Sequence, residues 1–347
     1  MSVYEGETQA TAMTRSTTNH LAFGGRTSVF SHQAFLYADV EELVAVTTAF
    51  VESAAAEQCP VLVAVPEPRL DILRDGLAGL HSAVEFVDMA EAGRNPGRIL
   101  SSVFTAFADD HPGRRVVVID EPIWPGRKPA EYAEAVRHEA LTNLAFAGVH
   151  ASIHCAYDVA RLPEAAVDAA VRTHPHLGGP YGSRPSPGYS DPADIARSCA
   201  AQLPPPPADA ATAHFEARDL RMMRRRVAAA ARAAGVEQHR VDDLQHAVNE
   251  VLTNTVVHTR SPGRISYWQD ARTFVCEVRD SGHIRDPLAG RRLPRSDQPT
   301  GRGLVLVHHL CDLVQVTSSR EGTVVRLHMD RDRDMDSADG RPEAASE

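Results

Sequence analysis

The chain has 347 residues, of which 43% are apolar and 24% charged, and its formal net charge is −10. This composition is typical of a globular protein with about two domains, and the excess of acid excludes a basic nucleic-acid-binding surface spread over the whole chain. Lys128 is the single lysine and lies in an Arg-Lys-Pro turn. P-loop enzymes and protein kinases of the usual fold are therefore excluded, because both place a lysine on the nucleotide phosphates.

Cysteine and histidine usage indicates neither a disulfide framework nor a structural zinc site. The five cysteines are widely spaced and form no CxxC pair, and the 17 histidines show no spacing typical of metal ligands. The polar N-terminus lacks the apolar run of a signal peptide, and no window is apolar enough to span a membrane. These features predict a cytoplasmic protein with no membrane or direct nucleic-acid contact.

The first half of the chain predicts an α/β domain. Residues 1–29 are rich in Thr, Ser and Gly, and we expect them to be disordered. Over residues 30–173, helical patterns alternate with short β runs, which predicts a mostly parallel sheet covered on both faces. In chain order the expected elements are a helix at 43–56, a strand at 60–65, a helix at 69–80, a strand at 84–87, a helix at 96–108, a strand at 115–120, a helix at 130–145, a strand at 149–157 and a helix at 163–173.

A second folded region follows a stretch rich in proline and glycine. Residues 174–212, which end in four consecutive prolines, are expected to be a linker. Residues 213–330 predict an α+β sandwich, and the mixed-charge tail 331–347 is expected to be disordered. The expected elements are helices at 218–234, 238–259 and 302–311, and strands at 264–269, 273–280, 313–317 and 323–329.

The expected helix 238–259 carries a polar stripe along the edge of its apolar face. His246, Glu250, Asn254 and His258 follow one another at intervals of four residues. An amide oxygen in this position can hold Mg²⁺, a hard ion that prefers oxygen ligands, and a neighbouring carboxylate can polarise a hydroxyl or a water. Taken alone, the pattern also fits an ordinary helix edge without a ligand.

Three further motifs follow along the chain. Asp280 and Gly282 end an expected strand, where a carboxylate could bind the exocyclic amine of a base. The sequence Thr-Gly-Arg-Gly-Leu at 300–304 begins an apolar helix, whose free N–H groups favour phosphate. Thr323, after Gly322, could bring a hydroxyl to the base. Each motif taken alone is more typical of ordinary turn or strand chemistry than of a binding site.

In order, the patterns ExxxNxxxH, DxG, GRGL and GT resemble the N, G1 and G2 boxes and the closing strand of the Bergerat-fold ATPases. The short loop and the sequence TGRGLVLVHHLCD are most similar to the anti-sigma-factor serine kinases of the RsbW and SpoIIAB branch. This resemblance implies ATP and Mg²⁺ as cofactors, with Glu250 as general base, Asn254 as Mg²⁺ ligand and Asp280 as adenine reader. It implies further ATP-binding residues at His258, Gly282, Gly301, Arg302, Gly303, Leu304 and Thr323.

The first domain resembles the MEDS sensory domain known from the DcmR regulators, which implies a RecA-like parallel sheet. The matching residues include HQAFLY (32–37), PVLVAVP (60–66), EPIW (121–124), RHE (137–139) and CAYD (155–158). The loop after the expected strand 60–65, where a P-loop would lie, has the sequence Pro-Glu-Pro-Arg at 66–69. It contains neither glycine nor lysine, so nucleotide hydrolysis is not expected there. Residues that could line a sensory pocket at the strand ends are His32, Tyr37, Glu121, Trp124, His138 and Tyr157.

A MEDS domain followed by an RsbW-like ATPase is the layout of RsbA-type anti-sigma regulators. The resemblance implies a regulator that sequesters a sigma factor and phosphorylates an antagonist of the STAS type on serine, with a homodimer as a further assembly to consider. A sensor histidine kinase is an alternative, because residues 137–141 resemble a phosphoacceptor box, although the usual proline and two-helix hairpin are absent. A second alternative is a non-catalytic binding module whose interactions are controlled by ATP. The arginines at 221 and 224–226 are either a solvated face or a docking surface for an acidic partner.

Overall fold

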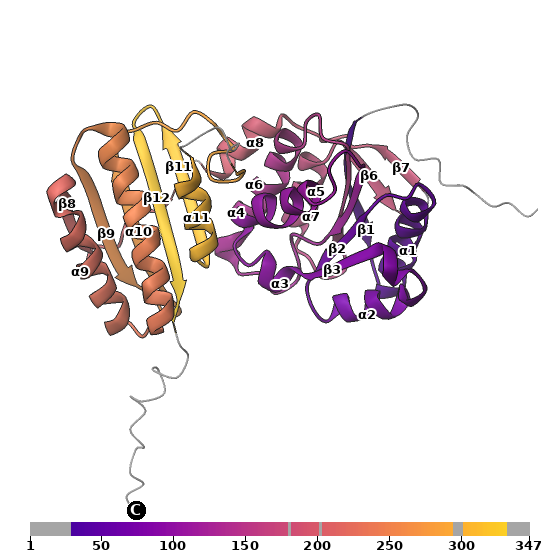
Figure 1. Cartoon of the computed structure of the whole chain (residues 1–347), viewed down its shortest axis with the longest axis horizontal. Coiled ribbons are helices and arrows are strands. Elements are labelled where there is room, and N and C mark those ends of the chain that lie inside the picture. The colour runs from indigo at the N-terminus through magenta and orange to yellow at the C-terminus, as the bar shows by residue number, and fades with distance from the viewer. Residues whose placement is uncertain (1–28, 180–181, 201–202, 294–300, 332–347) are drawn as a thin grey trace, which may run out of the picture.

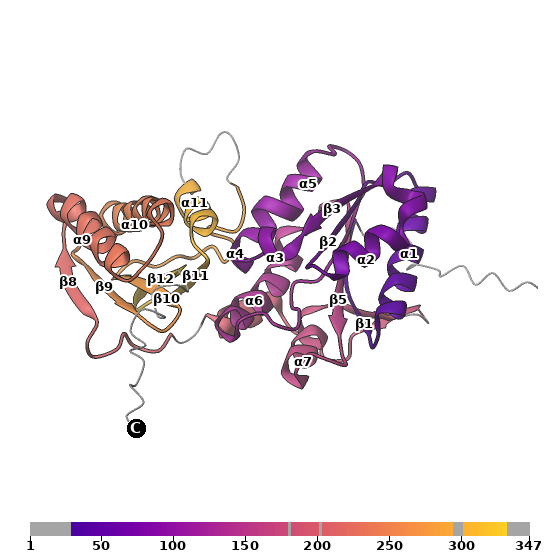
Figure 2. The same cartoon turned by 90° about the horizontal axis from the view of Figure 1, so that it is seen from below.

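The computed structural model describes residues 29–179, 182–200, 203–293 and 301–331, which form two domains, each built on its own sheet (Figures 1 and 2). The segments 1–28 and 332–347, most of what was expected to be disordered, lie outside the described residues. None of the described helices is long and apolar enough to cross a bilayer.

The first domain is organised around a sheet of seven strands in the order β3-β2-β4-β5-β1-β6-β7. All neighbouring strands are parallel except β6 and β7, which confirms the predicted mostly parallel sheet. Strand β1 had no counterpart among the predicted strands, because His32 and Gln33 interrupt its apolar pattern although both are buried. The strands are β1 (Phe30–Tyr37), β2 (Val61–Val65), β3 (Val84–Asp88), β4 (Val116–Asp120), β5 (Ala151–Asp158), β6 (His176–Gly179) and β7 (Gly182–Pro185).

Helices cover both faces of this sheet. Alternate residues of β2 belong to two separate apolar clusters, since successive side chains of a strand point to opposite faces. The helix expected at 96–108 is divided by a π-helical turn (η2) between α4 and α5. The helices are α1 (Val40–Ala56), α2 (Arg69–Gly76), η1 (Ala78–Ala83), α3 (Met89–Ala92), α4 (Pro96–Ile99), η2 (Leu100–Phe104), α5 (Thr105–Asp109), α6 (Pro129–Ala145) and α7 (Glu164–Thr173).

The expectation that residues 174–212 form a linker is wrong for much of the segment. Strand β6 pairs with β1 and extends the sheet, β7 pairs with β6, and helix α8 (Pro192–Cys199) packs against α6. Ile195 and Ala196 of α8 are buried. The proline and glycine content concealed these elements, because the short β6 and β7 join the sheet through backbone pairing and need no apolar run.

The second domain is an antiparallel sheet in the order β11-β12-β10-β9-β8, with α9, α10 and α11 on one face (Figure 2). This is the predicted α+β sandwich, with β8 as an additional edge strand. The elements are β8 (Ala211–Phe215), η3 (Ala217–Asp219), α9 (Leu220–Ala233), α10 (Gln238–Thr259), β9 (Gly263–Gln269), β10 (Thr273–Asp280), α11 (Arg302–Leu310), β11 (Leu313–Ser319) and β12 (Gly322–Asp330).

The two domains meet where α11 lies against α4 (Figure 1). A Cβ added to Gly97 of α4 would lie 2.0 Å from Nδ1 of the fully buried His308, so glycine permits this close approach. From α6, Arg137 Nη1 donates to the Val316 carbonyl at 2.7 Å, and Glu134 forms a buried ion pair with Arg291. Helix α11 is therefore held between the core of its own domain and the first domain.

Candidate functional site

Helix α10 places Glu250 and Asn254 at the edge of its buried face. Leu244, Val248 and Leu252 are fully buried in the domain core, whereas Glu250 and Asn254 are half-buried. Among the described residues, neither side chain forms a hydrogen bond or an ion pair. A carboxylate and an amide oxygen are thus presented side by side without an intramolecular partner in the described part of the chain.

The first turn of α11 borders this pair. A Cβ added to Gly303 would lie 2.8 Å from Glu250 Oε2 and 3.5 Å from Asn254 Nδ2. Gly301 caps the helix with φ of 100°, a left-handed conformation that favours glycine. The N–H groups of a first helical turn have no partner within the helix. The two glycines therefore bring unpaired backbone donors next to Glu250 and Asn254.

Asp280, at the end of β10, belongs to a hydrogen-bond network with α10 and β12. Its Oδ2 accepts from Thr255 Oγ1 at 2.7 Å, and its Oδ1 accepts from the Gly282 N–H at 2.8 Å. The Gly282 carbonyl accepts from Thr323 Oγ1 at 2.8 Å. The structure thus brings together Asp280, Gly282 and Thr323, which the sequence placed in two separate motifs.

Thr255 is a site residue that the sequence analysis missed, because its spacing made it part of the buried face of the helix. It follows Asn254 directly and fixes the Asp280 carboxylate, so α10 contributes to both parts of the site. Ser318 was also missed, although its Oγ lies 2.7 Å from Thr323 Oγ1. Ser318 lies near Thr323 because β11 pairs with β12, and no local sequence pattern predicts that pairing.

The remaining predicted ATP-binding residues lie at the margin of the site. His258, Gly301 and Arg302 are exposed, and Leu304 is half-buried at the start of α11. Residues 294–300, which precede α11 and include Thr300 of the predicted motif, lie outside the described residues.

The donor set fits a magnesium nucleotide. Asn254 and Glu250 offer oxygen atoms that no described side chain occupies, and Gly303 leaves the space beside them free of a side chain. An amide oxygen suits Mg²⁺, and the N-terminus of α11 suits phosphate. Asp280, held by Thr255 and Gly282, can accept a hydrogen bond from the amino group of a base.

A cavity of about 560 Å³ lies between the domains beside this site. It is lined from the first domain by Arg137 and Arg197, and from the second by the loop at 283–289 and the end of β11. Ser318 also lines it, so the cavity adjoins the network around Thr323. The first domain therefore reaches close to the Asp280 side of the site.

The predicted sensory residues of the first domain fall into several groups. Tyr37 donates a hydrogen bond to Glu121 Oε1 at 3.1 Å, and Arg69 Nε donates to Glu121 Oε2 at 2.6 Å. His32 and Tyr157 both contact Glu139, which the sequence analysis did not select. Two others pack elsewhere: the guanidinium of Arg127 lies over Trp124, and His138 packs on Phe104.

His138, in the segment that resembles a phosphoacceptor box, is fully buried, and burial lowers its pKa to about 3. A phosphoacceptor histidine must reach the γ-phosphate of ATP, so this position does not favour the histidine-kinase alternative.

Comparison with known proteins identifies both domains. Residues 31–175 match the family described as MEDS, the MEthanogen/methylotroph, DcmR Sensory domain, and residues 213–329 match the histidine kinase-like ATPase domain. The chain thus joins a MEDS domain to a histidine kinase-like ATPase domain. The two families occur in the order that the sequence motifs indicated.

One solved structure that resembles the chain is the crystal structure of the RsbU and RsbW domains of Rv1364c from Mycobacterium tuberculosis. It is 16% identical, with a TM-score of 0.27, and the match covers 35% of this chain and 33% of that one. The chain therefore spans about a third of that relative's length. No curated protein matches the chain.

Proposed function

We propose that the ATPase domain binds Mg²⁺-ATP between α10, α11 and the end of β10. The observation that carries this proposal is the first turn of α11 lying against Glu250 and Asn254, where a Cβ on Gly303 would come within 2.8 Å of the carboxylate. Asp280 would accept from the adenine amino group, and Asn254 Oδ1 would hold Mg²⁺. Bound Mg²⁺ would neutralise charge on the phosphates.

The activity we propose is transfer of the γ-phosphoryl group to a serine of a STAS-type antagonist. The serine oxygen would attack the γ-phosphorus as the bond to the β–γ bridging oxygen breaks, so that ADP leaves. Glu250 would accept the serine proton as general base. Its half-buried position without a partner among the described side chains supports this role, because the carboxylate is free to face a docked hydroxyl.

We further propose that the same domain sequesters a sigma factor, which places the protein in the cytoplasm. Helix α9 presents Arg221, Arg225 and Arg226 to solvent, while Arg224 Nη1 donates to Asn249 Oδ1 at 2.9 Å. An exposed arginine row suits an acidic protein surface through complementary charge. The first domain would modulate this activity through α11, which it contacts at Gly97.

A non-catalytic, ATP-gated binding module is the second candidate. The same contact of α11 with Glu250 and Asn254 would let nucleotide shift α11 without any chemistry. In that case the protein would bind its partners differently with and without ATP, and no phosphate would be transferred.

The two candidates are separated by a pull-down from native cytoplasm with and without Mg²⁺-ATP, followed by labelled ATP with the captured partners. Label on a partner serine supports the kinase, and nucleotide-dependent capture without label supports the binding module. Acid-labile label on the protein itself would favour a histidine kinase. The absence of ATP binding would overturn the proposal as a whole. Gel filtration of the same protein tests whether it is a homodimer.

A further inference from the structure

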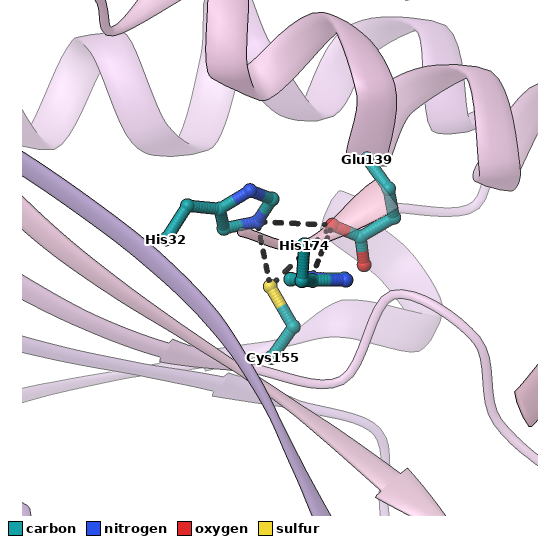
Figure 3. Close-up of side chains that lie close together, drawn as sticks. All are labelled: His32, Glu139, Cys155 and His174. Carbon is teal, nitrogen blue, oxygen red and sulfur yellow. Dashed lines mark hydrogen bonds and ion pairs between the residues drawn. The ribbon is translucent and has the colours of Figure 1, made fainter. Parts of the chain in front are cut away.

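Four potential metal ligands converge in the interior of the first domain. They are His32 of β1, Glu139 of α6, Cys155 of β5 and His174, which follows α7 (Figure 3). All four are buried, with no more than 1% of any side chain exposed, and their ligand atoms lie within 4.8 Å of one another. No spacing along the sequence indicated this cluster, because its four members come from separate segments of the chain.

The distances suit a single small ion. His32 Nε2 lies 3.2 Å from Glu139 Oε2 and 3.3 Å from Cys155 Sγ, and His174 Nε2 lies 3.2 Å from the same Glu139 oxygen. Cys155 Sγ lies 3.4 Å from Glu139 Oε2. Ligands of a tetrahedral zinc ion, at bond lengths of about 2.0–2.3 Å, are roughly 3.3–3.8 Å apart. Only small adjustments would place these four atoms around one ion.

The hydrogen bonds on the far side of each ring fix which nitrogen faces the cluster. His174 Nδ1 must donate to the Ala170 carbonyl at 2.9 Å, because that oxygen can only accept. His32 Nδ1 donates to Asn143 Oδ1 at 3.1 Å, and the orientation of that amide is set by its Nδ2, which donates to the Thr173 carbonyl at 2.8 Å. In the neutral rings, both Nε2 lone pairs therefore point into the cluster, as in metal-bound histidines.

Glu139 can offer Oε2 to an ion because its other carboxylate oxygen has a partner elsewhere. Its second oxygen, Oε1, accepts a hydrogen bond from Tyr157 at 2.8 Å. A bound metal ion would deprotonate the Cys155 thiol, because the thiolate is the form that ligates metal.

We propose that His32, Glu139, Cys155 and His174 form a zinc-binding site with four protein ligands. Two imidazoles, one thiolate and one carboxylate are a donor set that suits Zn²⁺, and their two negative charges balance the ion. The ligands come from two strands, a helix and the segment after α7, so the ion would tie β1, β5 and α6 together. Helix α6 also carries Glu134 and Arg137, which contact the ATPase domain.

The test is the metal content of the full-length protein, purified under reducing conditions without a metal-binding tag and analysed by inductively coupled plasma mass spectrometry. We expect about one zinc per chain, and loss of most of it in Cys155→Ala and His174→Gln. Cys59→Ala and His154→Gln, at a buried cysteine and a buried histidine of the same domain, are matched controls that should retain zinc. Stoichiometric retention in the ligand variants would overturn the proposal, as would a different metal in place of zinc.

A second measurement does not depend on the folding of any variant. The protein is stripped with a chelator and titrated with Co²⁺ alone, and a four-coordinate site with one thiolate should give visible absorption together with a thiolate-to-cobalt charge-transfer band. Asn143→Leu, which removes the partner of His32 Nδ1, should weaken Co²⁺ binding roughly 10–100-fold without abolishing the band. If the purified protein contains no zinc and the stripped protein gives no charge-transfer band, the cluster is a hydrogen-bonded network without metal.

Discussion

The side-chain amide of Asn95 donates a hydrogen bond to the main-chain carbonyl of His308 at 2.9 Å, across the boundary between the two domains. The same amide lies 3.3 Å from the Cys311 carbonyl, so Asn95 contacts the C-terminal end of α11. At the other end of that helix, Gly303 borders Glu250. One short helix therefore touches both the MEDS domain and the proposed nucleotide site.

The first prediction concerns Asn254. Asn254→Ala should weaken Mg²⁺-dependent ATP binding by at least about tenfold, because the oxygen of Asn249, the amide that precedes Glu250, already accepts a hydrogen bond from Arg224. Isothermal titration calorimetry with and without Mg²⁺ measures the effect. His246→Ala, at an exposed position of the same helix stripe, is the control and should bind as the parent does. Unchanged Mg²⁺-ATP affinity in Asn254→Ala would show that Asn254 holds no metal.

Glu250→Gln tests whether the domain performs chemistry. The amide preserves the shape of the side chain but cannot accept the serine proton, so transfer to the antagonist should fall roughly 10²–10⁴-fold. ATP affinity and binding of the sigma factor should stay close to those of the parent. Phosphate incorporation is measured with ATP affinity in parallel, and Glu321→Gln, at an exposed turn, serves as control. Equal transfer rates in parent and variant would contradict the role of Glu250 as base.

Gly303→Ala tests the contact between α11 and α10. The added Cβ would lie 2.8 Å from Glu250 Oε2, so the carboxylate must move aside. Alanine is the better helix former by about 1 kcal/mol, so the melting temperature should be unchanged or higher. Phosphoryl transfer should nevertheless fall about tenfold or more. A loss of transfer accompanied by a lower melting temperature would instead indicate damage to the fold.

Gly97→Ala tests the contact between the domains. Its Cβ would lie 2.0 Å from His308 Nδ1 and overlap it. We therefore expect the free energy of unfolding to fall by about 1–3 kcal/mol, and proteolysis at the domain boundary to become faster. Adding His308→Ala should restore part of the loss, and the double-mutant cycle from urea unfolding measures this coupling. Gly79→Ala, where an added Cβ meets no atom within 4 Å, is the control. Strict additivity of the two changes would argue against the contact.

A pH dependence follows from Glu121, whose pKa burial raises to about 7 despite the nearby Arg69. Because the folded state holds this proton more tightly than the unfolded chain, the contribution of Glu121 to stability is greatest at low pH. It declines as pH rises through about 7. The stability of the parent relative to Glu121→Gln should therefore fall by about 2–3 kcal/mol from pH 5 to pH 8, measured by urea unfolding. Tyr37 and Asp158 also face Glu121, and a difference independent of pH would show that the carboxyl does not titrate in this range.

Much of the ATPase domain could be predicted from the sequence, because the patterns that indicate it are local. The apolar spacing of 238–259 predicted α10 with the bounds that the structure has, and four-residue spacing placed Glu250 and Asn254 on one edge of it. The buried run at 116–120 and its neighbours likewise predicted a parallel sheet, because strands buried on both faces read as continuous apolar segments.

Only the tertiary structure decided which distant residues meet. The sequence predicts Thr255 as a core position, but the fold places Asp280 of β10 beside it. The sequence also predicts a linker where the structure has β6, which pairs with β1, and α8, which packs on α6. The cluster of His32, Glu139, Cys155 and His174 spans four segments with no common spacing, so no periodicity in the chain could indicate it. Sheet order and helix packing set these distances, and they arise from burial of the whole chain rather than from any local pattern.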